Sequence, residues 1–343
     1  MIHRINIVDL LEPSFSVPLV DVRTPAEHSH GHIPGAFNIP LFSNEERVRV
    51  GTTYKQQSRE KAILLGFDLT GSKWSGFIRE ALAISLDKKI ALHCWRGGMR
   101  SGAMAWALDL YGFEVYLLEG GYKSYRRWCH SQFELDYNLR VIGGKTGSGK
   151  TRILQQMREM GHQMIDLEDL AQHQGSAFGS MNRLVQPSQE QFENNMAWQL
   201  KEVDRQTVLW VEDESINIGK RTIPRSFYNQ MQLAPLIDLQ VSTQQRVEAL
   251  TIEYGLLEKP FLVAGTERIR KRLGPLRTKQ ALEAIVEDHM EEFIRIALGY
   301  YDKTYEKSLS KKNKDNIIPL TIDRQNLHEA VGLILDLELG RHL

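Results

Sequence analysis

The feature that most constrains the fold is an apolar segment at 139–142 that runs directly into the pattern G-x-x-x-x-G-K-T at 144–151. The residues after this pattern are helix-like, so the loop lies between a strand and a helix. In that setting, backbone N–H groups and the helix N-terminus surround a phosphate, Lys150 reaches its terminal oxygens, and Thr151 can hold Mg²⁺. The pattern therefore predicts an α/β domain with a phosphate-binding loop. The predicted binding residues are Gly144, Thr146, Gly147, Ser148, Gly149, Lys150 and Thr151.

A second apolar segment, 208–211, ends in Glu212 and Asp213. Parallel strands bring their carboxyl ends to one edge of a sheet, where ligands bind. One of the two acids is therefore expected to support the phosphate site or Mg²⁺, with Asp213 slightly favoured. Phosphate binding alone does not imply nucleotide hydrolysis.

A second strand–loop–helix transition surrounds Cys94, which follows the apolar residues 90–92 and precedes Arg100. Successive N–H groups and a helix N-terminus converge on such a loop, which suits an anion. The same field favours the thiolate, the nucleophilic form of cysteine. We therefore expect Cys94 and Arg100 to be catalytic; the alternative is a buried structural cysteine. The other predicted anion-binding residues are Trp95, Arg96, Gly97, Gly98, Met99 and Ser101.

Further strands are expected at 19–22, 38–41 and 115–118, alternating with helix-like segments. One predicted helix, 101–110, has Ala103, Trp106, Ala107 and Leu110 on one side. Alternation of this kind predicts mostly parallel sheets, and 343 residues suit two domains. We place these domains at 1–137 and 138–343, with the helix-like segment 122–138 as the connection.

Equal numbers of basic and acidic residues give a formal net charge of zero, so contact with nucleic acid requires a local patch. The basic segment, residues 259–280, contains a single acidic residue, Glu267. It is either a contact surface for a nucleic-acid backbone or a solvated helix face. The predicted tRNA contacts are Arg268, Arg270, Lys271, Arg272 and Arg277.

The chain has only two cysteines, Cys94 and Cys129, which argues against a disulfide framework and fits a reducing compartment. No apolar stretch approaches the roughly 18 residues of a membrane-spanning helix, and no signal-peptide pattern opens the sequence. We expect a cytoplasmic protein without a membrane partner.

The first 130 or so residues resemble a rhodanese domain. The resemblance rests on D-V-R-T-P-A-E at 21–27, G-H-I-P-G-A-F-N-I-P at 31–40, the Cys94 loop, and L-E-G-G-Y at 118–122. It implies that Cys94 carries sulfur or selenium as a persulfide-type adduct. Most small rhodaneses have C-x₄-R spacing, whereas this chain has C-x₅-R. The wider loop suits a phosphate-sized anion such as selenophosphate.

A rhodanese-like parallel-sheet domain followed by a P-loop NTPase-like α/β domain with a helical C-terminal part resembles the tRNA 2-selenouridine synthase family. Gln174 stands where that family has arginine. Further matching stretches are 51–57, 166–168, 173–179, 212–215, 269–274 and 300–302.

This resemblance implies a selenotransferase that also has geranyltransferase activity. Its substrate would be the wobble 2-thiouridine in the anticodon loop of tRNA. The sulfur is first alkylated by geranyl diphosphate, and selenium from selenophosphate then displaces the S-geranyl group. Neither co-substrate is a tightly bound cofactor, and Mg²⁺ is a candidate ion. The alternatives are an ATP-dependent tRNA sulfurtransferase, a rhodanese-like C-x₅-R phosphatase joined to a kinase-like domain, and a non-enzymatic binding module.

Overall fold

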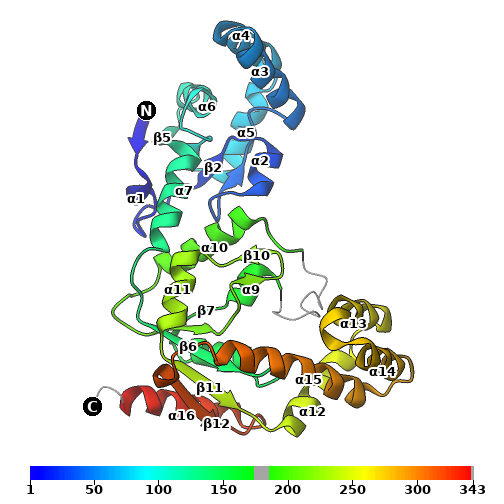
Figure 1. The fold of residues 1–343 in the computed structure, drawn as a ribbon. Helices are drawn as coiled ribbons and strands as arrows, with labels where there is room; N and C mark the ends of the chain where they lie inside the picture. The colour runs from blue at the N-terminus through cyan, green and yellow to red at the C-terminus, as the bar shows by residue number, and fades with distance from the viewer. Residues whose placement is uncertain (174–184, 341–343) are drawn as a thin grey trace. The chain divides into compact units, whose positions relative to one another are not determined.

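A computed structural model describes residues 1–173 and 185–340 (Figure 1), so Gln174 lies outside the described residues. The chain divides into two compact units. The first comprises Met1–Gln132 and Glu193–Trp198, and the second comprises Phe133–Phe192 and Gln199–Leu343. The division after Gln132 lies a few residues before the expected boundary at 137, and a short segment of a later helix joins the first unit.

The first unit contains a five-stranded parallel sheet with the order β1-β5-β4-β2-β3. Its central strand, β4, has four consecutive buried residues, as expected for a parallel strand covered on both faces. The strands are β1 (Ile2–Ile5), β2 (Leu19–Asp21), β3 (Phe37–Asn38), β4 (Lys89–His93) and β5 (Glu114–Leu118). The helices are α1 (Ile7–Leu10), α2 (Pro25–His30), α3 (Asn44–Gln56), α4 (Arg59–Thr70), α5 (Trp74–Ile84), α6 (Met99–Leu110) and α7 (Gly121–Gln132).

Two expectations about the helices of this unit are wrong in detail. The apolar side predicted for α6 includes Trp106 and Leu110, which are 57% and 75% exposed; the helix instead buries Met104 and Leu108. Nor is 122–138 a connection, because α7 ends at Gln132 and belongs to the core of the first unit.

The second unit also contains a five-stranded parallel sheet, with the order β12-β11-β6-β8-β7. Because β6 is central, the loop that follows it emerges in the middle of the sheet edge, beside the end of β8. The strands of this sheet are β6 (Leu139–Gly144), β7 (Gln163–Ile165), β8 (Leu209–Glu212), β11 (Leu236–Gln240) and β12 (Ile317–Thr321). A small antiparallel pair joins β9 (Asn217–Ile218) to β10 (Arg221–Thr222).

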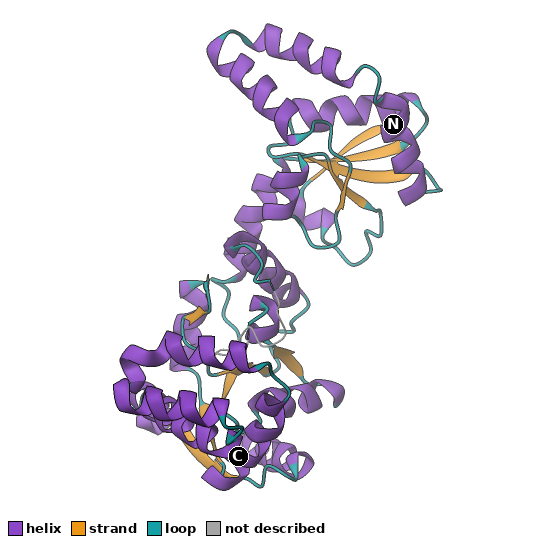
Figure 2. Cartoon of the chain, turned by 90° about the vertical axis from the view of Figure 1, so that its right-hand side faces the viewer, coloured by secondary structure: helices purple, strands orange, loops and turns teal. Residues whose placement is uncertain are grey.

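Helices surround the strands in each unit (Figure 2). In the second unit, α12 to α15 share a hydrophobic core of their own, the expected helical part. The remaining helices are α8 (Lys150–Glu159), α9 (Leu167–Ala171), α10 (Gln189–Lys201), α11 (Arg225–Leu233), α12 (Thr243–Gly255), α13 (Lys259–Leu273), α14 (Pro275–Val286), α15 (Met290–Leu309), the 3₁₀ helix η1 (Lys314–Asn316) and α16 (Leu327–Leu339).

These two parallel sheets with flanking helices confirm the predicted α/β class. Among the described residues, no helix is both long and apolar enough to span a bilayer.

Candidate functional site

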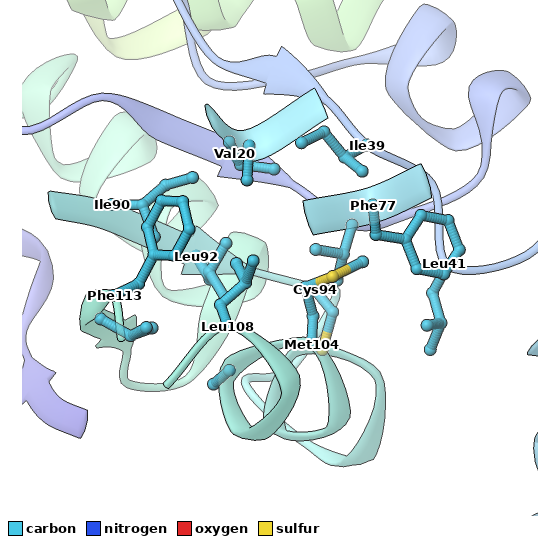
Figure 3. Close-up of a cluster of buried hydrophobic side chains, with 14 of the residues drawn as sticks. Val20, Ile39, Leu41, Phe77, Ile90, Leu92, Cys94, Met104, Leu108 and Phe113 are labelled. Carbon is cyan, nitrogen blue, oxygen red and sulfur yellow. The ribbon is translucent and has the colours of Figure 1, made fainter. Parts of the chain in front are cut away.

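Cys94 lies directly after β4, and α6 begins five residues later at Met99. Its side chain is only 4% exposed and packs with Leu92, Met104 and other core residues (Figure 3). The backbone N–H of Gly98 donates to Cys94 Sγ at 3.3 Å, and the Ser101 hydroxyl donates to it at 3.2 Å. The structure thus brings together the predicted residues Cys94, Gly98 and Ser101.

These donors change the ionisation of the thiol. Burial disfavours the thiolate, but hydrogen bonds from the Ser101 hydroxyl and from the N–H groups of Ser101, Arg96 and Gly98 outweigh it. Together they hold the pKa of Cys94 below its ordinary value. The loop therefore stabilises the nucleophilic form of the cysteine, as the sequence predicts.

The shape of the cysteine loop, residues 94–100, depends on two glycines in the left-handed region. Gly97 has φ +64°, and a Cβ there would lie 2.7 Å from the Leu118 carbonyl oxygen. Gly121 has φ +58°, and a Cβ there would collide with the Cys94 carbonyl. The Tyr122 N–H donates to that same carbonyl at 2.8 Å. The segment after β5 thus fixes the cysteine loop from one side.

Arg100 is oriented by Glu27, an acid to which no sequence pattern assigns a role. Its guanidinium makes two hydrogen bonds to Glu27, at 2.6 and 3.0 Å. Glu27 belongs to the capping box of α2 with Thr24. Trp95, Arg96 and Met99 are exposed along the loop. The geometry therefore places Arg100 at the end of the cysteine loop in an ion pair with Glu27.

A buried polar network supports the base of the loop. Arg23 and Asp21 form a fully buried ion pair at 2.6 Å, and the Arg23 guanidinium lies 3.8 Å from the centre of the Tyr122 ring. His93, also fully buried, has its pKa lowered to about 4 by burial, although Asp21 opposes this. It is therefore neutral at pH 7.

In the second unit, the predicted phosphate-binding loop, residues 144–151, connects β6 to α8. Gly147 and Gly149 have φ +82° and +92°, values that favour glycine. Gly149 is the N-cap of α8 and makes no side-chain capping bond, so the first N–H groups of the helix can bind an anion. Lys150 Nζ donates to the Gly144 carbonyl at 3.1 Å, across the loop.

Two arginines outside the motif fix the outer carbonyls of this loop. Arg246 of α12 donates to the Thr146 carbonyl at 3.1 Å and forms a double hydrogen bond with Asp302 of α15. Arg324, after β12, donates to the Gly147 carbonyl at 2.6 Å. The loop is thus held in shape by one arginine of α12, which α15 orients through Asp302, and by one arginine of the segment after β12.

The two acids after β8 have different partners. Glu212 is 1% exposed, and its Oε1 atom is buried without a partner. Burial raises the pKa of its carboxyl group, and the nearby Lys150 ammonium and Thr151 hydroxyl oppose this rise. Asp213 forms a buried ion pair with Lys312 at 2.6 Å. The geometry therefore favours Glu212 over Asp213 as the acid that serves the phosphate-binding loop.

Glu168 and Glu214 join Glu212 in an acidic cluster, with one carboxylate oxygen of each within 4.8 Å of the others. Burial, followed by repulsion from the neighbouring carboxylates, raises the pKa of Glu168 to about 9 and that of Glu214 to about 8. Carboxylates forced together in this way suit a divalent cation.

Both glutamates lie in stretches that resemble the family, 166–168 and 212–215, but no sequence pattern assigns them a role. Their proximity depends on β7 and β8 being neighbours in the sheet, which no local pattern states. The segment after β7 contains Glu168, and acids that follow adjacent parallel strands meet at one edge of the sheet. This placement is the signal from which the acidic cluster could be predicted.

The predicted tRNA contacts lie in the helical part, on α13 and α14, and all five side chains are exposed. Arg270 pairs with Glu267 within its own helix at 3.5 Å, and Arg272 donates to the Tyr300 hydroxyl at 3.2 Å. Burial and the charge of Arg268 lower the pKa of His173, so this arginine lies near the histidine.

Comparison with known proteins covers both units. Residues 7–127 match the rhodanese-like domain family, and residues 137–331 match the tRNA 2-selenouridine synthase AAA domain. The chain is 34% identical to the tRNA 2-selenouridine synthase of Shewanella denitrificans, over 87% of this chain and 89% of that protein. It is 38% identical to the enzyme of the same name from Nitrosomonas europaea, over 76% of this chain and 68% of that protein. It is 35% identical to the tRNA 2-selenouridine synthase of Hydrogenovibrio crunogenus, over 87% of this chain and 90% of that protein.

Proposed function

This chain belongs to the tRNA 2-selenouridine synthase family, and from that premise we propose that it replaces the sulfur of wobble 2-thiouridine in tRNA by selenium. Geranyl diphosphate first alkylates the sulfur, and selenium from selenophosphate then displaces the S-geranyl group. The observation that carries this proposal is the cysteine loop, where an N–H and an O–H group converge on Cys94 Sγ.

In the first step, the sulfur attacks the C1 carbon of the geranyl donor. An S–C bond forms, the C–O bond to diphosphate breaks, and a proton leaves N3 of the base. We assign the diphosphate to the phosphate-binding loop, where the N–H groups at the start of α8 and the Lys150 ammonium neutralise the departing charge.

Mg²⁺ fits this loop because the buried Oε1 of Glu212 has no partner and the Thr151 hydroxyl lies against the same carboxyl group. Thr151 and Glu212 would hold the ion, with Glu168 and Glu214 beside them. When bound, the ion would supply positive charge to the diphosphate oxygens.

In the second step, the selenium of selenophosphate attacks C2 of the S-geranylated base; a C2–Se bond forms and the C2–S bond breaks, and the departing sulfur takes a proton to give geranyl thiol. Water then cleaves the Se–P bond, which releases phosphate and leaves 2-selenouridine. Alkylation makes this possible, because a neutral thiol leaves more easily than a thiocarbonyl sulfur. Cys94 binds or relays selenium at the modified base. The N–H groups of the cysteine loop, together with Arg100, neutralise the selenophosphate oxygens.

The RNA substrate is assigned to the exposed cations of α13 and α14, which contact phosphates of the anticodon stem and loop. A wobble base lies in a single-stranded loop, so extruding it from the RNA costs little. Such an enzyme works in the cytoplasm, where tRNA is modified.

Two variants divide the reaction between the loops, with nucleosides identified by mass spectrometry. Lys150→Ala is expected to leave 2-thiouridine unalkylated but still convert pre-geranylated RNA to 2-selenouridine. Cys94→Ala is expected to stop at the S-geranyl nucleoside. The reverse pattern would contradict the assignment of the two steps.

A further inference from the structure

The hairpin formed by α3 and α4 in the first unit has no part in the sites described above. Only Gln57 and Ser58 separate the two helices, which pack mainly against each other. None of the side chains of α3 is fully buried. The hairpin extends away from the sheet of its own unit (Figure 1). Its far end, residues 49–61, is called the hairpin tip below.

The hairpin begins at the sheet edge that carries the cysteine loop. Both β3 and β4 pair in parallel with β2, so their carboxyl ends lie at one edge. Leu41, after β3, packs in the same apolar cluster as Cys94 (Figure 3). α3 begins three residues later, and Glu46 in its first turn pairs with Lys73, after α4, at 2.5 Å. The base of the hairpin is thus anchored on the side of the sheet where Cys94 lies.

The hairpin tip has an excess of positive charge. It contains four basic residues, all of them exposed, and one acidic residue, Glu60. Among the residues that the structure describes, none of the four forms an ion pair. Exposed cations elsewhere do so, as Lys259 does with Asp288 at 2.7 Å. The four cations of the tip are Arg49, Lys55, Arg59 and Lys61.

Exposed aromatic and polar groups lie between these cations. Tyr54 is 50% exposed, and Thr52, Gln56 and Gln57 are exposed beside it. Lysine and arginine bind phosphates, threonine and glutamine donate to phosphate and sugar oxygens, and an exposed aromatic ring stacks on an unpaired base. An acidic protein would neutralise the cations but would offer no base to the ring. The tip therefore suits a nucleic acid with single-stranded bases.

We propose that the hairpin tip is a second contact surface for the tRNA, where Lys55 and Arg59 bind backbone phosphates and Tyr54 stacks on an unpaired base. The inference rests on the proposed function in that it takes tRNA as the substrate. The 13 residues of α3 span about 20 Å from the sheet edge that carries the cysteine loop. The tip therefore contacts RNA beyond the base on which Cys94 acts, and it holds the substrate on the unit that transfers selenium.

The test is the fluorescence anisotropy of a labelled, unmodified tRNA transcript with the full-length protein at several salt concentrations. The double variant Lys55→Ala with Arg59→Ala removes two phosphate contacts. Its affinity for tRNA is expected to fall roughly tenfold, and the slope of log affinity against log salt by about two. Arg79→Ala with Lys311→Ala removes two exposed cations outside the tip and is the matched control.

An equal loss in the control would overturn the proposal, because any two cations would then have the same effect. Unchanged affinity and slope in the tip variant would also overturn it, and would leave an acidic protein as the partner of this surface.

Two variants of Tyr54 test the stacking contact. Tyr54→Phe keeps the ring and is expected to bind tRNA within twofold of wild type. Tyr54→Ala is expected to bind about fivefold more weakly or worse, with an unchanged salt slope. Equal affinities for the two variants would contradict stacking by this residue.

Neither geranyl diphosphate nor selenophosphate is present in these titrations, so the result does not depend on the chemistry of either step. A wild-type protein that does not bind tRNA would overturn the proposed function and this inference together. Binding of tRNA that the tip variants leave unchanged would overturn this inference alone.

Discussion

The reactivity of Cys94 depends on a single hydroxyl group as well as on backbone amides. Ser101→Ala removes the donor that approaches Sγ at 3.2 Å. Because this bond stabilises the charged form, its loss raises the pKa of the thiol. We expect alkylation by iodoacetamide at pH 7 to slow by roughly tenfold, with the midpoint of the rate profile at higher pH.

The same profile measured on Cys94→Ser gives the background from Cys129, which is fully buried. An identical midpoint in Ser101→Ala and wild type would mean that the N–H groups alone set the ionisation of Cys94.

The acidic cluster makes stability depend on pH. Glu214 has an unfolded-state pKa near 4.5 and a folded-state pKa raised to about 8 by burial and the Glu212 charge, so the folded protein holds its proton longer. The contribution of Glu214 to the free energy of unfolding is therefore largest below pH 4.5, and it falls as the pH rises towards 8. Glu214→Gln is expected to flatten this fall and to raise Tm at pH 8 by about 2–4 °C.

Thermal denaturation between pH 5 and 9 measures this effect, with Glu159→Gln, an exposed change at the end of α8, as the control. A Glu214→Gln variant with the wild-type slope would show that Glu214 is ionised in the folded protein.

At the residue scale, the sequence predicts those site residues whose positions follow from the local backbone alone. Cys94, Gly98, Lys150 and Thr151 lie in contiguous motifs whose geometry follows from residue order. Glu27, which orients Arg100, is far from it in sequence and becomes its neighbour only through the fold. Likewise, Asp213 looks like the better ligand until the ion pair with Lys312 is seen.

Among the elements, α13 and α14 carry the proposed RNA contacts. Lys271→Ala removes one exposed cation from α13. If this lysine contacts a phosphate, tRNA binding weakens and the slope of log affinity against log salt falls by about one.

Filter binding or anisotropy at several salt concentrations measures that slope. Lys311→Ala removes an exposed lysine outside the basic segment and serves as the control. Equal slopes for the two variants would identify the basic segment as a solvated helix face.

Strands with long apolar runs, such as β4 and β6, are predictable from sequence, whereas β1 and β7 are short and give no clear pattern. The apolar side predicted for α6 is wrong because Trp106 has the composition of a core residue but is not buried. It instead makes an edge contact with Trp74 of α5, with ring centres 6.4 Å apart, and stays largely exposed. Periodicity predicts that a helix has an apolar side but not which neighbours cover it.

For the whole molecule, two domains of parallel α/β type follow from the sequence, but their full membership does not. Residues 193–198 join the first unit because the Asn194 amide donates to the His32 carbonyl at 2.9 Å and to the Tyr122 hydroxyl at 2.7 Å. Contacts between residues so far apart in the chain leave no local signal.

The central claim is that one chain performs geranyl transfer and then selenium transfer on the same base. The most direct test incubates the wild-type protein with 2-thiouridine tRNA and each co-substrate alone or both together, and identifies the nucleosides by mass spectrometry. Geranyl diphosphate alone should give the S-geranyl nucleoside, selenophosphate alone should leave 2-thiouridine unchanged, and both together should give 2-selenouridine. Formation of 2-selenouridine without geranyl diphosphate, or no change in any tube, would contradict the account.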